Sequence, residues 1–294
     1  MSRLRFQQVD VFTSVPFKGN PVAVILDSDR LSTAQMQAIA NWTNLSETTF
    51  IAPANDPVAD YRLRIFTPRS ELPFAGHPTI GSAYAMLRSG YVPRQPGVLV
   101  QECGKGLVEL RVDGERLFFR LPTPAFTLPD SRQVAEAAVA LGIAKTEIVG
   151  TAIIDVGPVW LTVQLPDAQA VTDLKPDMAA IAALSRSPVT GLTVFGFYKN
   201  GGLAAVEVRS FAPVDGVAED PVCGSGNGCV AAFIQRDKLL GRHSYTATQG
   251  GCLQRDGRVQ VRFSEDGAIW IGGDAVTCIE GSLLAESALS QRNG

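Results

Sequence analysis

Three residues of this sequence have side chains suited to proton transfer. Glu47 lies in the segment NLSET, His77 stands between a glycine and a proline, and Asp220 directly precedes a proline. Carboxylates and an imidazole can take, hold and return a proton near neutral pH. Each also has a structural interpretation: Glu47 as a loop carboxylate, His77 as a hydrogen-bonded structural residue, and Asp220 as a turn former.

His77 and Asp220 lie in two segments that resemble each other. RIFTPRSELPFAGHPTIGSAYAML starts at Arg64, and VRSFAPVDGVAEDPVCGSGNGCVAAFI starts at Val208. Both pass from a β-branched and aromatic stretch through Phe-x-Pro into a turn that ends at glycine, followed by small residues with helical periodicity. Solenoid repeats are usually only ~20–50 residues long, so this much longer spacing indicates two duplicated domains.

The same order of elements extends upstream, where GNPVAV and GPVWLT each predict a strand after a turn. We expect domains at residues 1–125 and 126–294, and the last segment can pack back on the first domain. One long helix among many short strands in each domain predicts an α+β fold with mostly antiparallel sheets rather than a doubly wound sheet. The predicted strands of the second domain include 252–254, 259–263 and 268–272.

Chemistry is expected where the two copies differ, because shared residues are needed for the shared fold. His77, Asp220 and Glu47 each lack an equivalent in the other copy; their counterparts are Ser225, Leu72 and Leu192.

Gly76 and Gly224 each begin a predicted helix. Free backbone amides and the helix dipole at such a position favour a small anion, and a carboxylate is the guest that we expect. GSGNG lacks the spacing of a dinucleotide-binding motif, and no phosphate-binding lysine follows it.

Cys223 precedes Gly224, and a helix N-terminus can lower the pKa of a thiol. It could therefore be a nucleophile or proton carrier, or simply a small buried residue. Neither a C-x-x-C pair nor a histidine at ligand spacing accompanies the cysteines, so no metal site is predicted.

Composition excludes several functions. The net charge of −3 provides no basic surface for nucleic acid and argues against anionic membranes. The first residues lack the apolar core of a signal peptide, and no stretch is apolar enough to span a membrane. Five cysteines, an odd number, indicate reduced thiols, so we expect a cytoplasmic protein.

The motifs GNPVAV, NLSET, FAGHPT and EDPVCGSGNG, in this order, resemble the PhzF-like isomerase family of phenazine biosynthesis. The resemblance runs from Val9 to about Ile271. It implies the fold of diaminopimelate epimerase, in which each of two similar domains rolls a sheet around a central helix and the active site lies between them. It also implies a homodimer without a metal or organic cofactor.

At the matching positions of this sequence, the resemblance implies that Glu47 is the general base and acid, and that His77 and Asp220 assist it. A second set would bind or orient the substrate carboxylate: Ser46, Gly76, His77, Gly224 and Ser225.

The epimerase relatives have a thiol before each glycine, whereas this sequence has Ala75 and Cys223. We therefore expect a cofactor-free isomerase that moves a proton within a small acid, such as a dihydro-hydroxyanthranilate. Two alternatives remain: an amino-acid racemase or epimerase that uses Cys223 with Glu47, and a small-acid binding protein without turnover. The three acid-base residues argue against the last.

Overall fold

The computed structural model describes residues 2–185, 188–199 and 204–285. These residues form two compact units, unit 1 with residues 2–119 and 273–285 and unit 2 with residues 120–272. The chain thus passes from one unit to the other at 119/120 and 272/273, while the sequence predicts one boundary at 125/126.

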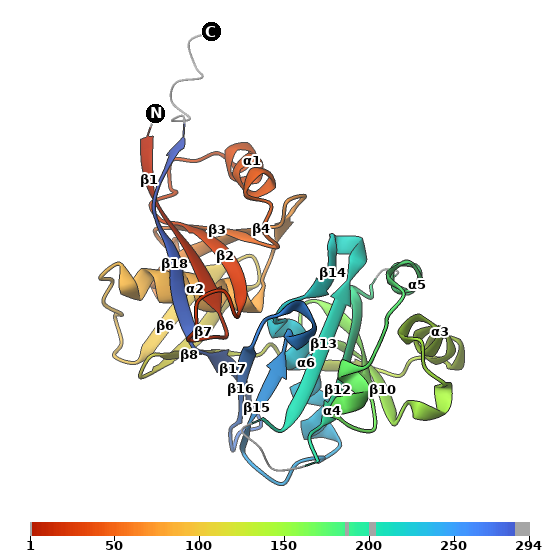
Figure 1. The fold of residues 1–294 in the computed structure, drawn as a ribbon. Helices are drawn as coiled ribbons and strands as arrows, with labels where there is room; N and C mark the ends of the chain where they lie inside the picture. Colours follow the sequence, from red (N-terminus) through yellow and green to blue (C-terminus); the bar gives the residue numbers. More distant parts are fainter. Residues whose placement is uncertain (1, 186–187, 200–203, 286–294) are drawn as a thin grey trace. The chain divides into compact units, whose positions relative to one another are not determined.

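Unit 1 contains one mixed sheet with the strand order β18-β1-β2-β3-β4-β6-β7-β8 (Figure 1). The β2–β3 and β4–β6 pairs are parallel, and the other pairs are antiparallel. A short strand, β5, pairs with β4. The elements are β1 (Ser2–Val11), β2 (Asn20–Ile25), α1 (Thr33–Thr43), β3 (Thr48–Ala52), β4 (Tyr61–Phe66), β5 (Glu71–Leu72), α2 (Gly76–Arg88), β6 (Val98–Cys103), β7 (Gly106–Asp113), β8 (Arg116–Arg120) and β18 (Ala275–Ala285).

Unit 2 repeats this pattern with the order β9-β10-β11-β12-β13-β15-β16-β17. Its two parallel pairs, β11–β12 and β13–β15, stand at the same places in the order as those of unit 1. The elements are β9 (Ala125–Thr127), α3 (Ser131–Leu141), β10 (Gly150–Asp155), β11 (Val159–Gln164), α4 (Ala168–Thr172), α5 (Met178–Leu184), β12 (Gly191–Phe197), β13 (Val206–Ala212), β14 (Val217–Asp220), α6 (Gly224–Arg236), β15 (Ser244–Gln249), β16 (Gly257–Phe263) and β17 (Ile269–Gly273). The α+β fold and the duplication are confirmed.

Each sheet buries one central helix. Ten of the thirteen residues of α2 and ten of the thirteen residues of α6 are buried. Successive strand side chains point to opposite faces, so alternate residues reach the central helix. In unit 1 the Ser82 hydroxyl of α2 donates to Thr49 on β3, and in unit 2 the Phe195 ring of β12 packs edge-on against Phe233 of α6.

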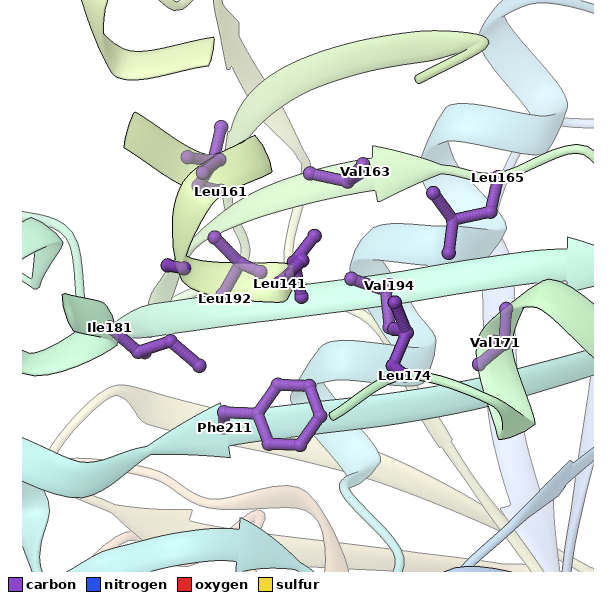
Figure 2. Close-up of a cluster of buried hydrophobic side chains, with 12 residues drawn as sticks. Leu141, Leu161, Val163, Leu165, Val171, Leu174, Ile181, Leu192, Val194 and Phe211 are labelled. Atoms are coloured by element: carbon purple, nitrogen blue, oxygen red, sulfur yellow. The ribbon is translucent and has the colours of Figure 1, made fainter. Parts of the chain in front are cut away.

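The other face of each sheet is covered by further helices. Figure 2 shows the cluster in unit 2, where Leu192, Val194 and Phe211 of the sheet meet Leu141 of α3 and Ile181 of α5. In unit 1, Met36 and Ala40 of α1 pack in the corresponding way. Each sheet thus packs between its central helix on one face and the outer helix or helices on the other.

The strand predicted at 252–254 is wrong. Residues Gly251–Leu253 form a short 3-10 helix, and β15 ends just before it. Gly250 and Gln254 on its two sides have φ values of 95° and 60°, which reverse the chain and interrupt sheet pairing. No helix in the described part of the chain has the length and apolar character needed to cross a membrane.

Candidate active site

An arginine–glutamate pair braces the turn before each central helix. Arg64 on β4 binds Glu71 with its shortest contact at 2.6 Å, and Arg209 on β13 binds Glu219 at 2.8 Å. Each guanidinium also lies 5.1 Å from the phenylalanine ring two residues along its own strand. The duplication thus preserves the bracing of both turns as well as the helices that follow them.

Glu47 lies in the loop between α1 and β3. Asn44 ends α1 with a left-handed backbone, at φ 54°, a conformation that asparagine tolerates. The Thr43 and Thr48 hydroxyls, 2.7 Å apart, close the loop at its base. Ser46 and Glu47 are both half-buried within it. The carboxylate is therefore carried by a short loop held at both ends.

Glu47 and His77 face each other within unit 1. The Oε2 atom of Glu47 lies 3.3 Å from Nε2 of His77, and the two side chains are 16% and 5% exposed. Both atoms are buried and lack a hydrogen-bond partner among the described residues. On its other side the imidazole is anchored to β2, with Nδ1 3.4 Å from Nδ2 of Asn20. The pair is thus fixed in place, with two buried polar atoms close together but outside hydrogen-bonding geometry.

The environment of His77 favours the neutral imidazole. Burial lowers the pKa of His77, and this effect exceeds the opposing influence of the Glu47 and Asp10 charges and of a hydrogen bond to the Pro21 carbonyl. A neutral imidazole can accept or donate one proton at the atom that faces Glu47.

The start of α2 offers backbone donors. Ala75 caps the helix without a side-chain hydrogen bond. In the first backbone hydrogen bond of the helix, the Thr79 amide donates to the Ala75 carbonyl. The helix therefore provides no acceptor for the amides of Gly76 and His77. Pro78 is tolerated there because its missing N–H lies in the first turn.

Asp220 ends β14 in unit 2. Its Oδ1 atom accepts the Val222 amide at 3.0 Å, which makes the turn that the sequence allowed as a structural role. Helix α6 begins at Gly224, two residues after Val222. The structure therefore places Asp220, Gly224 and Ser225 on one short segment, and the carboxylate also helps to shape it.

Of the two interpretations of Cys223, the small buried residue agrees with the structure. The side chain is only 3% exposed, and burial, with the charge of Asp220 and a hydrogen bond to it, raises the pKa well above its usual value. Contacts with Ser225 and Gly226 lower it but do not compensate. Desolvation outweighs the helix terminus here, so the protonated thiol prevails near neutral pH.

Two polar contacts to the predicted site residues come from residues that the sequence analysis did not single out for chemistry. Asn20 approaches His77, and the Trp160 indole donates to the Ser225 hydroxyl at 3.0 Å. Asn20 lies in the segment GNPVAV and Trp160 in the segment GPVWLT. The similarity of these two segments is the sequence feature that could have indicated both residues. Unit 1 therefore holds Ser46, Glu47, Gly76 and His77, and unit 2 holds Asp220, Cys223, Gly224 and Ser225.

Among the described residues, no group of three or more His, Cys, Asp or Glu side chains is placed to hold a metal ion.

Comparison with known proteins identifies relatives over most of the chain. The family described as phenazine biosynthesis-like protein, PhzC-PhzF, matches residues 9–281. Antisense-enhancing sequence 1 of Schizosaccharomyces pombe is 43% identical, over 96% of this chain and 99% of its own. Trans-2,3-dihydro-3-hydroxyanthranilate isomerase of Pseudomonas aeruginosa is 32% identical, over 94% of this chain and 98% of its own.

A solved structure agrees with these matches. The phenazine biosynthesis protein of the PhzF family from Bacillus anthracis superposes with a TM-score of 0.84 and 26% identity, covering 97% of this chain and 100% of that one. Taken together, the matched family, the relatives named as isomerases and the shared fold show that this chain belongs to the PhzC-PhzF family and is an isomerase.

Proposed function

We propose that this isomerase moves a proton between carbons of a small unsaturated acid, with Glu47 as the group that takes and returns it. The observation that carries the proposal is the contact between Glu47 and His77, in which both facing atoms are buried without hydrogen-bond partners. Buried polar groups normally have partners, so a pair without them is typical of a site that is completed by a ligand.

The chemistry needs one acid-base group and stabilisation of the charge that develops. The Glu47 carboxylate takes a proton from one carbon, and the electron pair of that C–H bond moves into the conjugated system toward the substrate carboxylate. The protonated Glu47 then returns the proton to another carbon, so the product has the composition of the substrate. His77 assists this transfer, and backbone amides at a helix start stabilise the extra negative charge.

The substrate class that we propose is a dihydro-hydroxyanthranilate, because a relative that matches nearly the whole chain is named for that reaction. Asp220, Gly224 and Ser225 join the proposal through the sequence resemblance, with Asp220 assisting proton transfer and the other two binding the carboxylate. Cys223 has no part in this proposal, because Glu47 alone takes and returns the proton.

Solvent deuterium incorporation tests the proposal. Wild-type protein in D₂O with trans-2,3-dihydro-3-hydroxyanthranilate should place deuterium on the substrate carbon that receives the proton, detected by NMR and mass spectrometry. Glu47→Gln keeps the size of the side chain but removes the base, and should lower the rate by about 100-fold or more.

Glu109→Gln is the matched control, because Glu109 lies on β7 in an exposed ion pair with Arg111. Its rate should equal that of the wild type. Full exchange by Glu47→Gln would contradict the role of Glu47, and a wild type that neither exchanges deuterium nor forms product, both followed by NMR, would contradict the substrate class.

A further inference from the structure

The Gln249 side chain contacts the backbone of the segment that carries Asp220. This glutamine is the last residue of β15 and is 1% exposed. Its Oε1 atom accepts the backbone amide of Cys223 at 3.1 Å, and its Nε2 atom donates to the backbone carbonyl of Asp220 at 2.9 Å. One buried amide therefore spans the turn on both sides of Pro221.

The same amide is tied to the first turn of α6. Asn227 donates from Nδ2 to Gln249 Oε1 at 2.8 Å and to the Cys223 carbonyl at 2.9 Å. Asn227 is fully buried, and its own backbone amide bonds to the Cys223 carbonyl at 3.0 Å. Strand β15, the turn and the helix start are thus joined in one network of hydrogen bonds.

Unit 1 lacks this arrangement at the matching place. Gly104 lies against Pro73 as Gly250 lies against Pro221, since a Cβ on either glycine would approach its proline within 2.8 Å or 2.5 Å. The residue before the glycine is a cysteine in unit 1 and Gln249 in unit 2. The added hydrogen bonds therefore belong to the copy of the turn that has Asp220 where the other has Leu72.

We infer that Gln249 is a positioning residue, which holds the Asp220–Ser225 segment so that the Asp220 carboxylate and the Gly224 and Ser225 amides keep the geometry needed for isomerisation. A side-chain amide suits this task because it accepts and donates at once, which neither a methionine nor a carboxylate can do. The link to catalysis rests on the proposed function, whereas the link to the local geometry does not.

The first experiment measures local geometry without a substrate. Iodoacetamide labelling of the native protein, followed by peptide mass spectrometry, gives separate rates for Cys223 and for Cys229, a fully buried thiol of the same helix. Gln249→Met should raise the labelling rate of Cys223 about tenfold, since two hydrogen bonds to the turn are lost. The rate at Cys229 should stay within about twofold of the wild-type rate.

Gln101→Met is the matched control. Gln101 is also a fully buried glutamine near the end of a strand, but its hydrogen bonds go to the side chains of Tyr61 and Thr79 in unit 1. This variant should leave the Cys223 rate unchanged. The inference is overturned if Gln249→Met leaves the labelling rate of Cys223 unchanged. It is also overturned if the labelling rates of Cys223 and Cys229 rise equally, because that would indicate a loss of structure throughout α6.

Gln249→Glu adds a test by pH that also serves if Gln249→Met does not fold. A protonated carboxyl group at this position can donate to the Asp220 carbonyl and accept from the Cys223 amide, whereas the ionised form only accepts. Hydrogen exchange of the backbone amides in the peptide that contains Cys223, divided by the wild-type rate at each pH, should therefore be near one at low pH and rise as the introduced group ionises. A ratio that does not change with pH would contradict the role of the donated bond.

The activity arm uses deuterium exchange with trans-2,3-dihydro-3-hydroxyanthranilate. We expect kcat/KM to fall about tenfold in Gln249→Met and to recover at low pH in Gln249→Glu, relative to the wild type at the same pH. A faster labelling of Cys223 in Gln249→Met with an unchanged kcat/KM would overturn the catalytic part of the inference. If the wild type neither exchanges deuterium nor forms product, the proposed substrate class fails, and the labelling ratios still decide whether Gln249 holds the turn.

Discussion

Glu47 and His77 come from two separate elements of unit 1 and meet with 3.3 Å between Oε2 and Nε2. The loop after α1 carries the carboxylate, and the first turn of α2 carries the imidazole. Because the pKa of His77 is lowered by burial, its neutral ring can share a proton with Glu47 without holding a permanent charge.

Replacing the imidazole should slow proton transfer without removing it. His77→Gln keeps a polar group of similar size but cannot relay a proton, and we expect the deuterium exchange rate to fall, by less than in Glu47→Gln. His243→Gln, which alters the exposed second histidine of the chain, should exchange at the wild-type rate. An equal loss in both variants would argue against a specific role for His77.

The lowered pKa of His77 also predicts how stability depends on pH. Below 6.5, the ordinary value, the unfolded chain binds a proton at this residue while the folded chain resists it, so protonation favours unfolding. Stability should therefore fall as pH drops below about 6.5, down to the lowered pKa. Thermal denaturation between about pH 7.5 and pH 5 should show a smaller decrease in Tm for His77→Gln than for wild type. Parallel curves would contradict this.

The buried Arg209–Glu219 pair differs from an exposed ion pair in its expected energy. Glu219→Gln leaves the Arg209 guanidinium, which is 6% exposed, without its counter-ion and should cost about 3–5 kcal/mol in the free energy of unfolding. Asp27→Asn breaks the pair with Arg5, in which both side chains are more than half exposed, and should cost no more than about 1 kcal/mol. Urea denaturation of both variants checks the contrast, and similar losses would refute it.

Gly81 brings α2 close to the sheet of unit 1. A Cβ at this position would lie 2.4 Å from Cγ1 of Val22 and 3.0 Å from Cγ2 of Val11. Gly81→Ala gains up to about 1 kcal/mol in helix propensity, but overpacking of about 1–3 kcal/mol should exceed that gain.

We therefore expect a lower Tm for Gly81→Ala, together with slower exchange because α2 carries His77. Gly281→Ala, where a Cβ meets nothing within 4 Å, should change the free energy of unfolding by less than about 0.5 kcal/mol. A stabilised Gly81→Ala would show that the sheet yields to the added methyl group.

The alternative of a racemase or epimerase predicts a different result at Cys223. Since the raised pKa keeps this thiol protonated, Cys223→Ala should retain proton exchange into the unsaturated acid. Chiral chromatography after incubation with free amino acids should detect no change of configuration with wild type. Racemisation that disappears in Cys223→Ala would support the alternative instead.

The sequence predicted the duplication, the fold class and the family, because strand and helix patterns and the four motifs are local features. It also identified Glu47 and His77, whose proximity inside unit 1 the structure then revealed. It could not reveal the Gln249 hydrogen bonds or the high pKa of Cys223, since both depend on burial and on partners far along the chain. The strand predicted at 252–254 was wrong because the left-handed backbone at Gln254 is not visible in a sequence.

Strand β18 pairs with β1 along the edge of unit 1, although all of unit 2 separates them in the chain. The equivalent edge strand of unit 2, β9, precedes its partner β10 by only a helix and a short connection. During synthesis, unit 2 therefore has all its strands as soon as its own residues are made, whereas the sheet of unit 1 waits for residues 275–285 to leave the ribosome. The duplicated halves thus differ in folding order as well as in chemistry, and the half that carries Glu47 and His77 is completed last.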